Sequence, residues 1–171
     1  VLGAWLLISF VVGAVDLPRH WGFSSLSASA DSWEQLLRGM TITGAAIIGL
    51  GLIGSSIARA VRESRAADII VGCDSDEFTL SFARTQKLVD TVTNDPMQAV
   101  RTSQLVILAT PPGTFAEICK KMTPGLSPGC IIMDTASVKE SAMRDIASNI
   151  PSNVDFIPAH PVAGSEKSGI K

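Results

Sequence analysis

Three glycines at fixed spacing and one acidic residue downstream form the strongest chemical signal in the sequence. Residues 49–54 read Gly-Leu-Gly-Leu-Ile-Gly, and Asp74 stands 20 residues after the last glycine. In this pattern the first glycine permits a tight turn, the second lets the backbone approach a pyrophosphate, and the third lets a helix pack closely on a strand. An acidic residue about 20 positions further on binds a ribose. The spacing therefore predicts a dinucleotide site formed by Gly49, Leu50, Gly51, Leu52, Ile53, Gly54 and Asp74.

The residues around Asp74 favour NAD over NADP as the dinucleotide. A carboxylate at this position would accept hydrogen bonds from the adenosine ribose and would repel the 2′-phosphate of NADP. The next two residues, Ser75 and Asp76, supply no arginine that could compensate. NAD is therefore the predicted cofactor, and NADP is the less favoured alternative.

Three further candidates follow apolar runs later in the chain. Thr110 and Pro111 begin the turn Thr-Pro-Pro-Gly, which is rigid and poor in N–H groups. We predict that this turn lies against the nicotinamide half of the cofactor, and a plain proline loop is the alternative. Ser137 stands just ahead of a predicted helix, where it could instead be an N-cap. His160 lies between prolines after the last apolar run, where an imidazole could titrate and reach a substrate; a histidine bonded to loop backbone is the alternative.

These candidates fall at the ends of strands in a repeated strand–helix pattern. Apolar runs predict strands, and apolar residues at helical spacing predict helices, such as the one that carries Phe78 and Phe82 on one face. Strands that are apolar on both sides indicate a parallel sheet covered by helices on each face. The predicted fold class is α/β, a doubly wound parallel sheet of the Rossmann type, which binds ligands at the carboxyl ends of its strands. The predicted strands are residues 45–50, 69–73, 89–92, 105–109, 130–133 and 154–157, and the predicted helices are residues 53–65, 77–87, 97–102, 115–122 and 139–150.

Composition excludes several classes of protein. The 171 residues include 14 Lys and Arg against 16 Asp and Glu, and 46% of the chain is hydrophobic. Disorder is therefore excluded, and the slightly acidic balance argues against a nucleic-acid partner. The cysteines, Cys73, Cys119 and Cys130, are odd in number and form no C-x-x-C pair, so we expect buried free thiols, no metal site and a cytoplasmic location.

Residues 1–39 differ in composition from the remainder of the chain. They hold all three tryptophans and an uncharged apolar run at residues 2–15, which is shorter than the roughly 20 residues that cross a bilayer. We expect an extension outside the domain; an export or membrane segment and a packed N-terminal helix are the alternatives. Met40 stands before the first strand as an initiator would, so residues 40–171 are the predicted dinucleotide-binding domain, with the start of an active site.

Several motifs together resemble those of the prephenate/arogenate (cyclohexadienyl) dehydrogenase family. They are GLGLIGSSIARA at residues 49–60, the Asp74 position, DTASVKES at residues 134–141 and HPVAGSEKSG at residues 160–169. The resemblance extends from about Thr43 to Lys171. It implies an enzyme of tyrosine biosynthesis that oxidises the ring carbinol of prephenate or arogenate by hydride transfer to NAD, with loss of carbon dioxide.

The resemblance also implies roles for individual residues. His160 would accept the proton of the substrate's ring hydroxyl, Ser137 would bond the same hydroxyl and orient His160, and Glu166 would line and gate the site. Lys139 and Lys167 fall within the motifs, but we expect them to be solvated and assign them no chemistry. No metal is required, because aromatisation drives the decarboxylation once hydride has left.

The chain departs from the family pattern at its end. Family members continue into a helical domain that forms a homodimer and supplies an arginine to the substrate, whereas this chain stops at Lys171. We therefore expect a chain truncated before that domain and inactive alone. Two alternatives remain open: an NAD-dependent dehydrogenase of the same superfamily that acts on a small hydroxyacid, and an NAD-binding module without catalysis.

Overall fold

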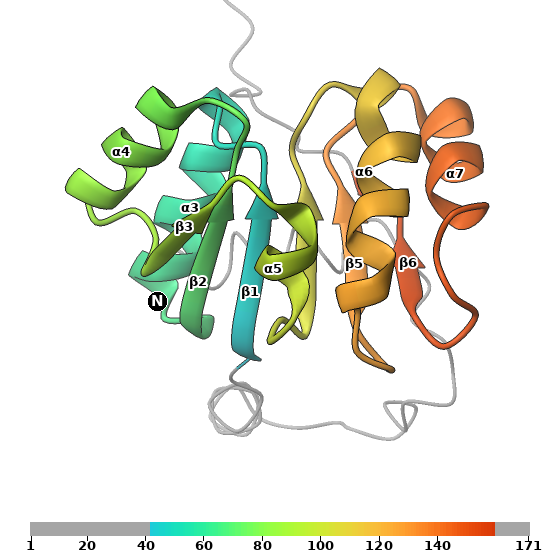
Figure 1. The fold of residues 1–171 in the computed structure, drawn as a ribbon, viewed down its shortest axis with the longest axis horizontal. Helices are drawn as coiled ribbons and strands as arrows, with labels where there is room; N and C mark the ends of the chain where they lie inside the picture. The colour runs from blue at the N-terminus through green and yellow to red at the C-terminus, as the bar shows by residue number, and fades with distance from the viewer. Residues whose placement is uncertain (1–41, 160–171) are drawn as a thin grey trace, which may run out of the picture.

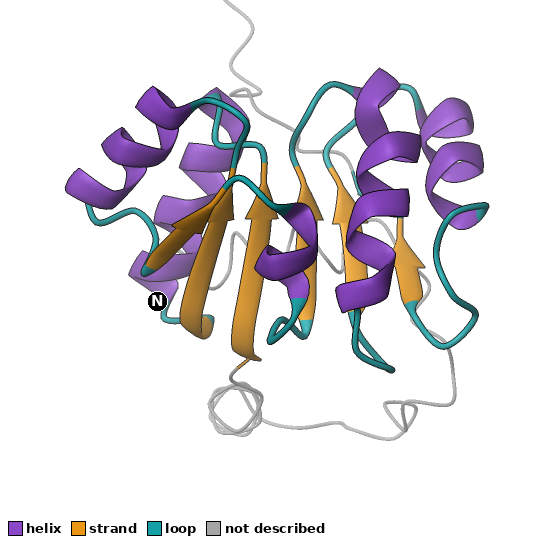
Figure 2. Ribbon diagram, in the orientation of Figure 1, coloured by secondary structure: helices purple, strands orange, loops and turns teal. Residues whose placement is uncertain are grey.

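Six parallel strands with helices on both faces make up the described part of the computed structural model, residues 42–159 (Figure 1, Figure 2). The predictions for residues 1–39, His160, Glu166 and Lys167 lie outside this range. No helix within residues 42–159 is long and apolar enough to cross a bilayer. In chain order the elements are β1 (Ile42–Ile48), α3 (Leu52–Ser64), β2 (Ala67–Cys73), α4 (Glu77–Thr85), β3 (Thr91–Thr93), α5 (Pro96–Val100), β4 (Leu105–Leu108), η3 (Pro112–Thr114), α6 (Phe115–Met122), η4 (Thr123–Gly125), β5 (Ile131–Asp134), α7 (Lys139–Ala147) and β6 (Asp155–Ile157).

The strand order β3-β2-β1-β4-β5-β6 confirms the predicted doubly wound sheet. The chain proceeds outward from β1 through β2 to β3, then returns to the other side of β1 and proceeds outward through β4 to β6. The order reverses between β1 and β4, which pair in parallel with Ile48 opposite Leu108. Sheets of this order bind ligands at that reversal, outside the carboxyl ends of the strands. The reversal therefore locates the edge at which a site is expected.

The central strand β1 is apolar on both sides because helices cover both sides of it. Ala46 and Ile48 belong to the core cluster that includes residues of α5, α6 and α7, whereas Ile47 belongs to the cluster that includes residues of α3 and α4. Successive side chains of a strand point to opposite faces, so the two clusters lie on opposite sides of the sheet. In Figure 1, α5 and α6 lie in front of the strands.

The structure corrects the end of the first strand and the buried face of the second predicted helix. The first strand was expected to reach residue 50 but ends at Ile48, because Gly49 has a φ of 93°, which interrupts the extended backbone. Phe78 and Phe82 were predicted on one face of a helix, and their side chains are 78% and 52% exposed. The short helix α4 instead buries Leu80 and Ala83, so the aromatic spacing marked a solvent-facing side.

Candidate functional site

The glycine loop between β1 and α3 is closed by contacts that tolerate no side chain at Gly54. A Cβ atom at this position would lie 1.8 Å from the carbonyl oxygen of Gly49 and 3.3 Å from the Cβ of Ala109. The first turn of α3 therefore lies directly on the end of β1 and beside the end of β4. This is the close packing of helix on strand that the third glycine was predicted to permit.

The middle glycine, Gly51, faces open space. No atom lies within 4 Å of a Cβ built on it, so a ligand could approach the backbone here. Gly51 is also the N-cap of α3 and provides no side-chain cap, which leaves the first amides of the helix without that partner. The side chain of Leu52 is 93% exposed at the same place. An open backbone, uncapped amides and an exposed apolar side chain together suit the binding of a diphosphate beside an apolar group.

The side chain of Asp74 is hydrogen-bonded directly to the glycine loop. Its Oδ2 accepts a hydrogen bond from the N–H of Leu50 at 2.8 Å, and its Oδ1 accepts one from the N–H of Asp76 at 3.0 Å. An ionised carboxylate has about four acceptor sites, so two remain for ribose hydroxyls. The structure therefore brings Asp74 and the glycine loop together, as the spacing predicted, and adds a structural role that the spacing did not indicate.

Thr110 and Pro111 lie on the other side of the glycine loop. A Cβ atom on Gly49 would come within 2.7 Å of the Thr110 methyl carbon, so the β4 loop packs against the β1 loop. The hydroxyl of Thr114 donates to the carbonyl of Pro111 at 2.8 Å and lies 2.9 Å from the hydroxyl of Thr110. These bonds order the turn at the point where the strand order reverses.

The cysteines contribute no nucleophile to this edge. All three are buried, as expected. Burial, with smaller contributions from the charges of Asp74 and Asp95, raises the pKa of Cys73 to about 12, so the thiol next to Asp74 stays neutral. Within residues 42–159, no three His, Cys, Asp or Glu side chains gather as metal ligands.

Ser137 lies in the loop after β5, and its side chain is exposed. The N-cap of α7 is Val138, which makes no side-chain cap, so Ser137 does not occupy the cap position that was its alternative reading. Exposure leaves the hydroxyl accessible from the carboxyl edge of the sheet. Its relation to His160 and Glu166 lies outside the described residues.

The expectation that Lys139 is solvated was wrong. Its ammonium lies 2.7 Å from the carboxylate of Asp134, and its side chain is 31% exposed while that of Asp134 is fully buried. Sequence reasoning assigned no role to Asp134, although a carboxylate directly after a buried strand with a lysine five residues later is a readable signal. The loop that holds Ser137 is therefore built around an ion pair whose carboxylate is buried.

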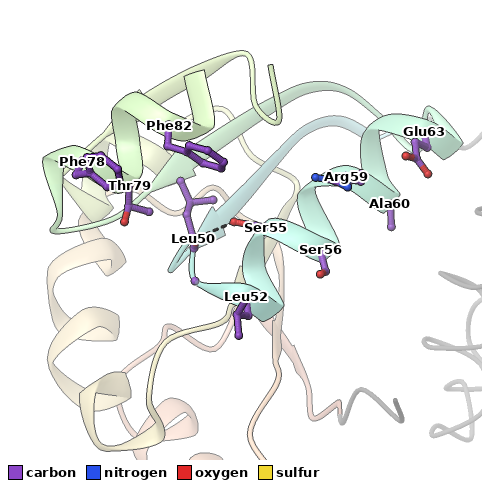
Figure 3. Close-up of a pocket in the computed structure, with 11 residues that line it drawn as sticks. Leu50, Leu52, Ser55, Ser56, Arg59, Ala60, Glu63, Phe78, Thr79 and Phe82 are labelled. Atoms are coloured by element: carbon purple, nitrogen blue, oxygen red, sulfur yellow. Dashed lines mark hydrogen bonds between the residues drawn. The ribbon is translucent and has the colours of Figure 1, made fainter. Parts of the chain in front are cut away.

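A surface groove lies beside this edge and does not coincide with it. It has a volume of about 520 Å³ and lies along α3 and α4, where Leu50 and Gly51 form one end. Figure 3 shows Phe78 and Phe82 on one side of it and Arg59 on the other, with the Ser55 hydroxyl bonded to the carbonyl of Leu50. Neither Asp74 nor Thr110 lines the groove. We therefore place the candidate site at the β1–β4 edge.

Comparison with known proteins identifies the family of the chain. Residues 57–171 match the family described as "Prephenate dehydrogenase, nucleotide-binding domain". The cyclohexadienyl dehydrogenase of Zymomonas mobilis is 42% identical over 125 residues, which are 72% of this chain and 42% of that protein. The prephenate dehydrogenase of Lactococcus lactis is 35% identical over 127 residues, 72% of this chain and 35% of that protein.

A solved structure shows the same fold. It is the crystal structure of prephenate dehydrogenase from A. aeolicus in complex with hydroxyphenyl propionate and NAD+, with a TM-score of 0.64 and 31% identity over 74% of this chain and 44% of that one. The chain thus spans less than half the length of each of these three proteins. The match over residues 57–171 covers well over half of the chain, and the chain therefore belongs to the prephenate dehydrogenase family, in which it corresponds to the nucleotide-binding domain.

Proposed function

We propose that this chain is the NAD-binding part of an oxidoreductase that converts prephenate, arogenate or both by oxidative decarboxylation. The observation that carries the proposal is the open backbone at Gly51, next to a carboxylate, Asp74, that is bonded to the same loop. The family match and the NAD+ complex of the A. aeolicus relative support a nicotinamide dinucleotide at this edge.

The described residues fit a dinucleotide in three places. The uncapped amides of the first turn of α3 would donate to the pyrophosphate, and Gly51 would leave room for it. The free acceptor sites of Asp74 would bind the ribose hydroxyls, and the same charge favours NAD over NADP. Thr110 and Pro111 would lie against the nicotinamide half, on the β4 side of the reversal.

The chemistry requires one hydride acceptor and one base. When bound, the oxidised nicotinamide accepts hydride from the ring carbon that carries the hydroxyl. We assign His160 to accept the proton of that hydroxyl, Ser137 to bond the same oxygen and Glu166 to line the site, as the resemblance implies. The carbon–carbon bond to the ring carboxylate breaks, carbon dioxide leaves, and the electron pair completes the aromatic ring, whose oxygen takes the proton back from His160 to give the phenol. A positioned base contributes about 10²- to 10⁴-fold to such a reaction.

The test is formation of reduced nicotinamide by the protein expressed from the complete open reading frame. Prephenate and arogenate are each assayed with NAD and with NADP. Turnover with either substrate, faster with NAD, is the expected result. Binding of NAD without turnover on either substrate would refute the proposed reaction and would favour a small hydroxyacid substrate or a binding module.

A histidine pair provides the matched variants for the proposed base. We expect His160→Asn to lower kcat by about 10²- to 10⁴-fold while the Kd for NAD changes little, because the proton acceptor is lost and the cofactor contacts remain. His20→Asn, in the predicted extension, is the control and should keep full activity. Equal activity of the two variants would refute the assignment of His160.

Two further parts of the proposal concern organisation. We propose that residues 40–171 form the dinucleotide-binding domain and that residues 1–39 are dispensable for it. Expression from Met40 should then leave the affinity for NAD unchanged. The resemblance also supports a homodimer joined through a helical domain, which light scattering of the complete protein would detect as twice the mass of one chain.

A further inference from the structure

The carboxylate of Asp134 joins two loops at the carboxyl edge of the sheet. It is the last residue of β5 and is fully buried. Its Oδ2 accepts hydrogen bonds from the N–H of Ala136 at 2.9 Å and from the ammonium of Lys139 at 2.7 Å. Its Oδ1 accepts one from the N–H of Ala159 at 3.1 Å, and Lys139 also donates to the carbonyl of Ala159. One ion pair thus holds backbone from the loop after β5 and from the segment after β6.

These bonds extend the connection between β5 and β6 beyond the end of the sheet. The strand pairing ends with Met133 opposite Ile157, so no further pairing holds Ala159 beside β5. A buried carboxylate is costly unless charge and hydrogen bonds compensate it, and here both oxygens accept hydrogen bonds and one of them is paired with an ammonium. Because each donor comes from a different place in the chain, loss of one partner would loosen the other contacts.

The residues next to these anchors are the ones to which we assign the chemistry. Ser137 follows Ala136, and His160 follows Ala159, so each candidate is one Cα step of about 3.8 Å from an anchored residue. We propose that Asp134 and Lys139 are positioning residues that fix the two loops, and therefore Ser137 and His160, relative to each other. The catalytic consequence rests on the proposed function, whereas the anchoring of the loops does not.

The anchoring is tested without any reaction, by amide hydrogen exchange in the complete protein. Lys139→Met removes the ammonium and leaves the carboxylate uncompensated. We expect exchange in peptides that contain the amides of Ala136 and Ala159 to become at least tenfold faster, while peptides from β1 exchange as in the wild type. Unchanged exchange at both loops would overturn the proposal.

Lys121→Met is the matched control. This variant also removes a lysine ammonium from a 2.7 Å ion pair, that of Lys121 with Glu117. Both side chains of this pair are exposed and belong to the same helix, α6. Exchange in the loops after β5 and β6 should not change in this variant. An equal acceleration in both variants would show that any loss of lysine charge loosens these loops, and would overturn the specific role of Lys139.

Kinetics test whether the anchoring positions the reacting groups. We expect Lys139→Met to lower kcat by about 10- to 100-fold, since small displacements of reacting groups have effects of that size, and to leave the Kd for NAD within about twofold. If Lys139 only stabilised the fold, its loss would lower the affinity for NAD, the folded fraction and kcat together. Faster exchange with unchanged kcat would overturn the positioning role.

Lys139→Arg separates positioning from direct chemistry and covers the case in which Lys139→Met does not fold. Arginine retains the positive charge and the donors, so we expect slow exchange at both loops and at least a third of the wild-type kcat. Slow exchange with kcat as low as in Lys139→Met would show that the ammonium acts directly, and would overturn the proposal. If the wild type turns over neither substrate, the proposed function fails, and the exchange experiment still decides the anchoring.

Discussion

Alanine substitutions at Gly54 and Gly51 should separate the stability of this domain from its affinity for NAD. At Gly54 the new methyl group would lie 1.8 Å from the backbone oxygen of Gly49 and 2.9 Å from its carbonyl carbon. Neither atom belongs to a flexible side chain, so β1 and α3 must move apart. At Gly51 the methyl group would meet no atom within 4 Å. The same substitution, three residues apart, is therefore expected to have opposite consequences.

The expected magnitudes follow from these distances. Overpacking lowers the free energy of unfolding by about 1–3 kcal/mol and occasionally more. The higher helix propensity of alanine offsets at most about 1 kcal/mol of this loss at Gly54. We expect the free energy of unfolding to fall by about 1–3 kcal/mol in Gly54→Ala. In Gly51→Ala it should fall by at most about 1 kcal/mol, because the new side chain is unhindered and the remaining cost is that alanine is a poorer N-cap than glycine.

Affinity should respond in the opposite way. In Gly51→Ala the methyl group occupies the space proposed for the pyrophosphate and prevents at least one hydrogen bond to a charged group. Such a bond contributes about 1.5–3 kcal/mol, so the Kd for NAD should rise by about 10- to 150-fold. Urea unfolding measures the first quantity, and titration calorimetry with NAD measures the second.

Two results would refute this reasoning. Wild-type stability of Gly54→Ala would show that the helix does not pack on β1 as described. Wild-type affinity of Gly51→Ala, in a folded protein, would show that the dinucleotide does not approach the backbone at this glycine.

Two further predictions concern the cofactor preference and the thiols. Asp74→Ser should narrow the preference for NAD over NADP, measured as the ratio of the two Kd values. It should also weaken NAD binding, because Asp74 accepts a hydrogen bond from the N–H of Leu50. Asp76→Ser is the control, and an equal ratio in the wild type and Asp74→Ser would contradict the ribose assignment. Burial raises the pKa of Cys73 and Cys119 to about 12 and that of Cys130 to about 11, so a thiol reagent at pH 8 should leave all three unmodified in the folded chain and modify them in denaturant. The pKa values of the thiols are higher in the folded chain than in the unfolded chain, so the thiols stabilise the fold fully below about pH 9, and this contribution is lost as the pH rises toward 12. Rapid labelling of the folded chain at pH 8 would contradict the burial of the thiols.

Local patterns predicted much of the fold because they encode local geometry. The helix expected over residues 115–122 has those bounds in the structure, since an amphipathic spacing and a proline turn before it are both local signals. The strands were recognised from uninterrupted apolar runs, which occur where helices cover both faces of a sheet. The end of the first strand was misplaced because a single positive φ, that of Gly49, decided this boundary.

The exposed face of α4 shows where local patterns are ambiguous. Phe78 and Phe82 have the spacing of a core-facing pair, but α4 presents Leu80 and Ala83 to the sheet instead. The rotation of a short helix is set by which face packs best on its neighbours. That choice depends on β2 and α3 and not on the spacing within α4 itself.

The alternation of strands and helices by itself determined the fold class, and the order of the glycines with the distance to Asp74 predicted the edge at which we propose that the dinucleotide binds. The glycines and Asp74 lie within about 30 consecutive residues, in one strand–helix–strand unit. The contact of Asp134 with Ala159 was decided only by the tertiary structure. Ala159 lies 25 residues from Asp134, and its contribution is a backbone N–H and a backbone carbonyl, which every non-proline residue has. A backbone partner of this kind cannot be predicted from the pattern of side chains, because only the parallel pairing of β5 with β6 brings the ends of the two strands together.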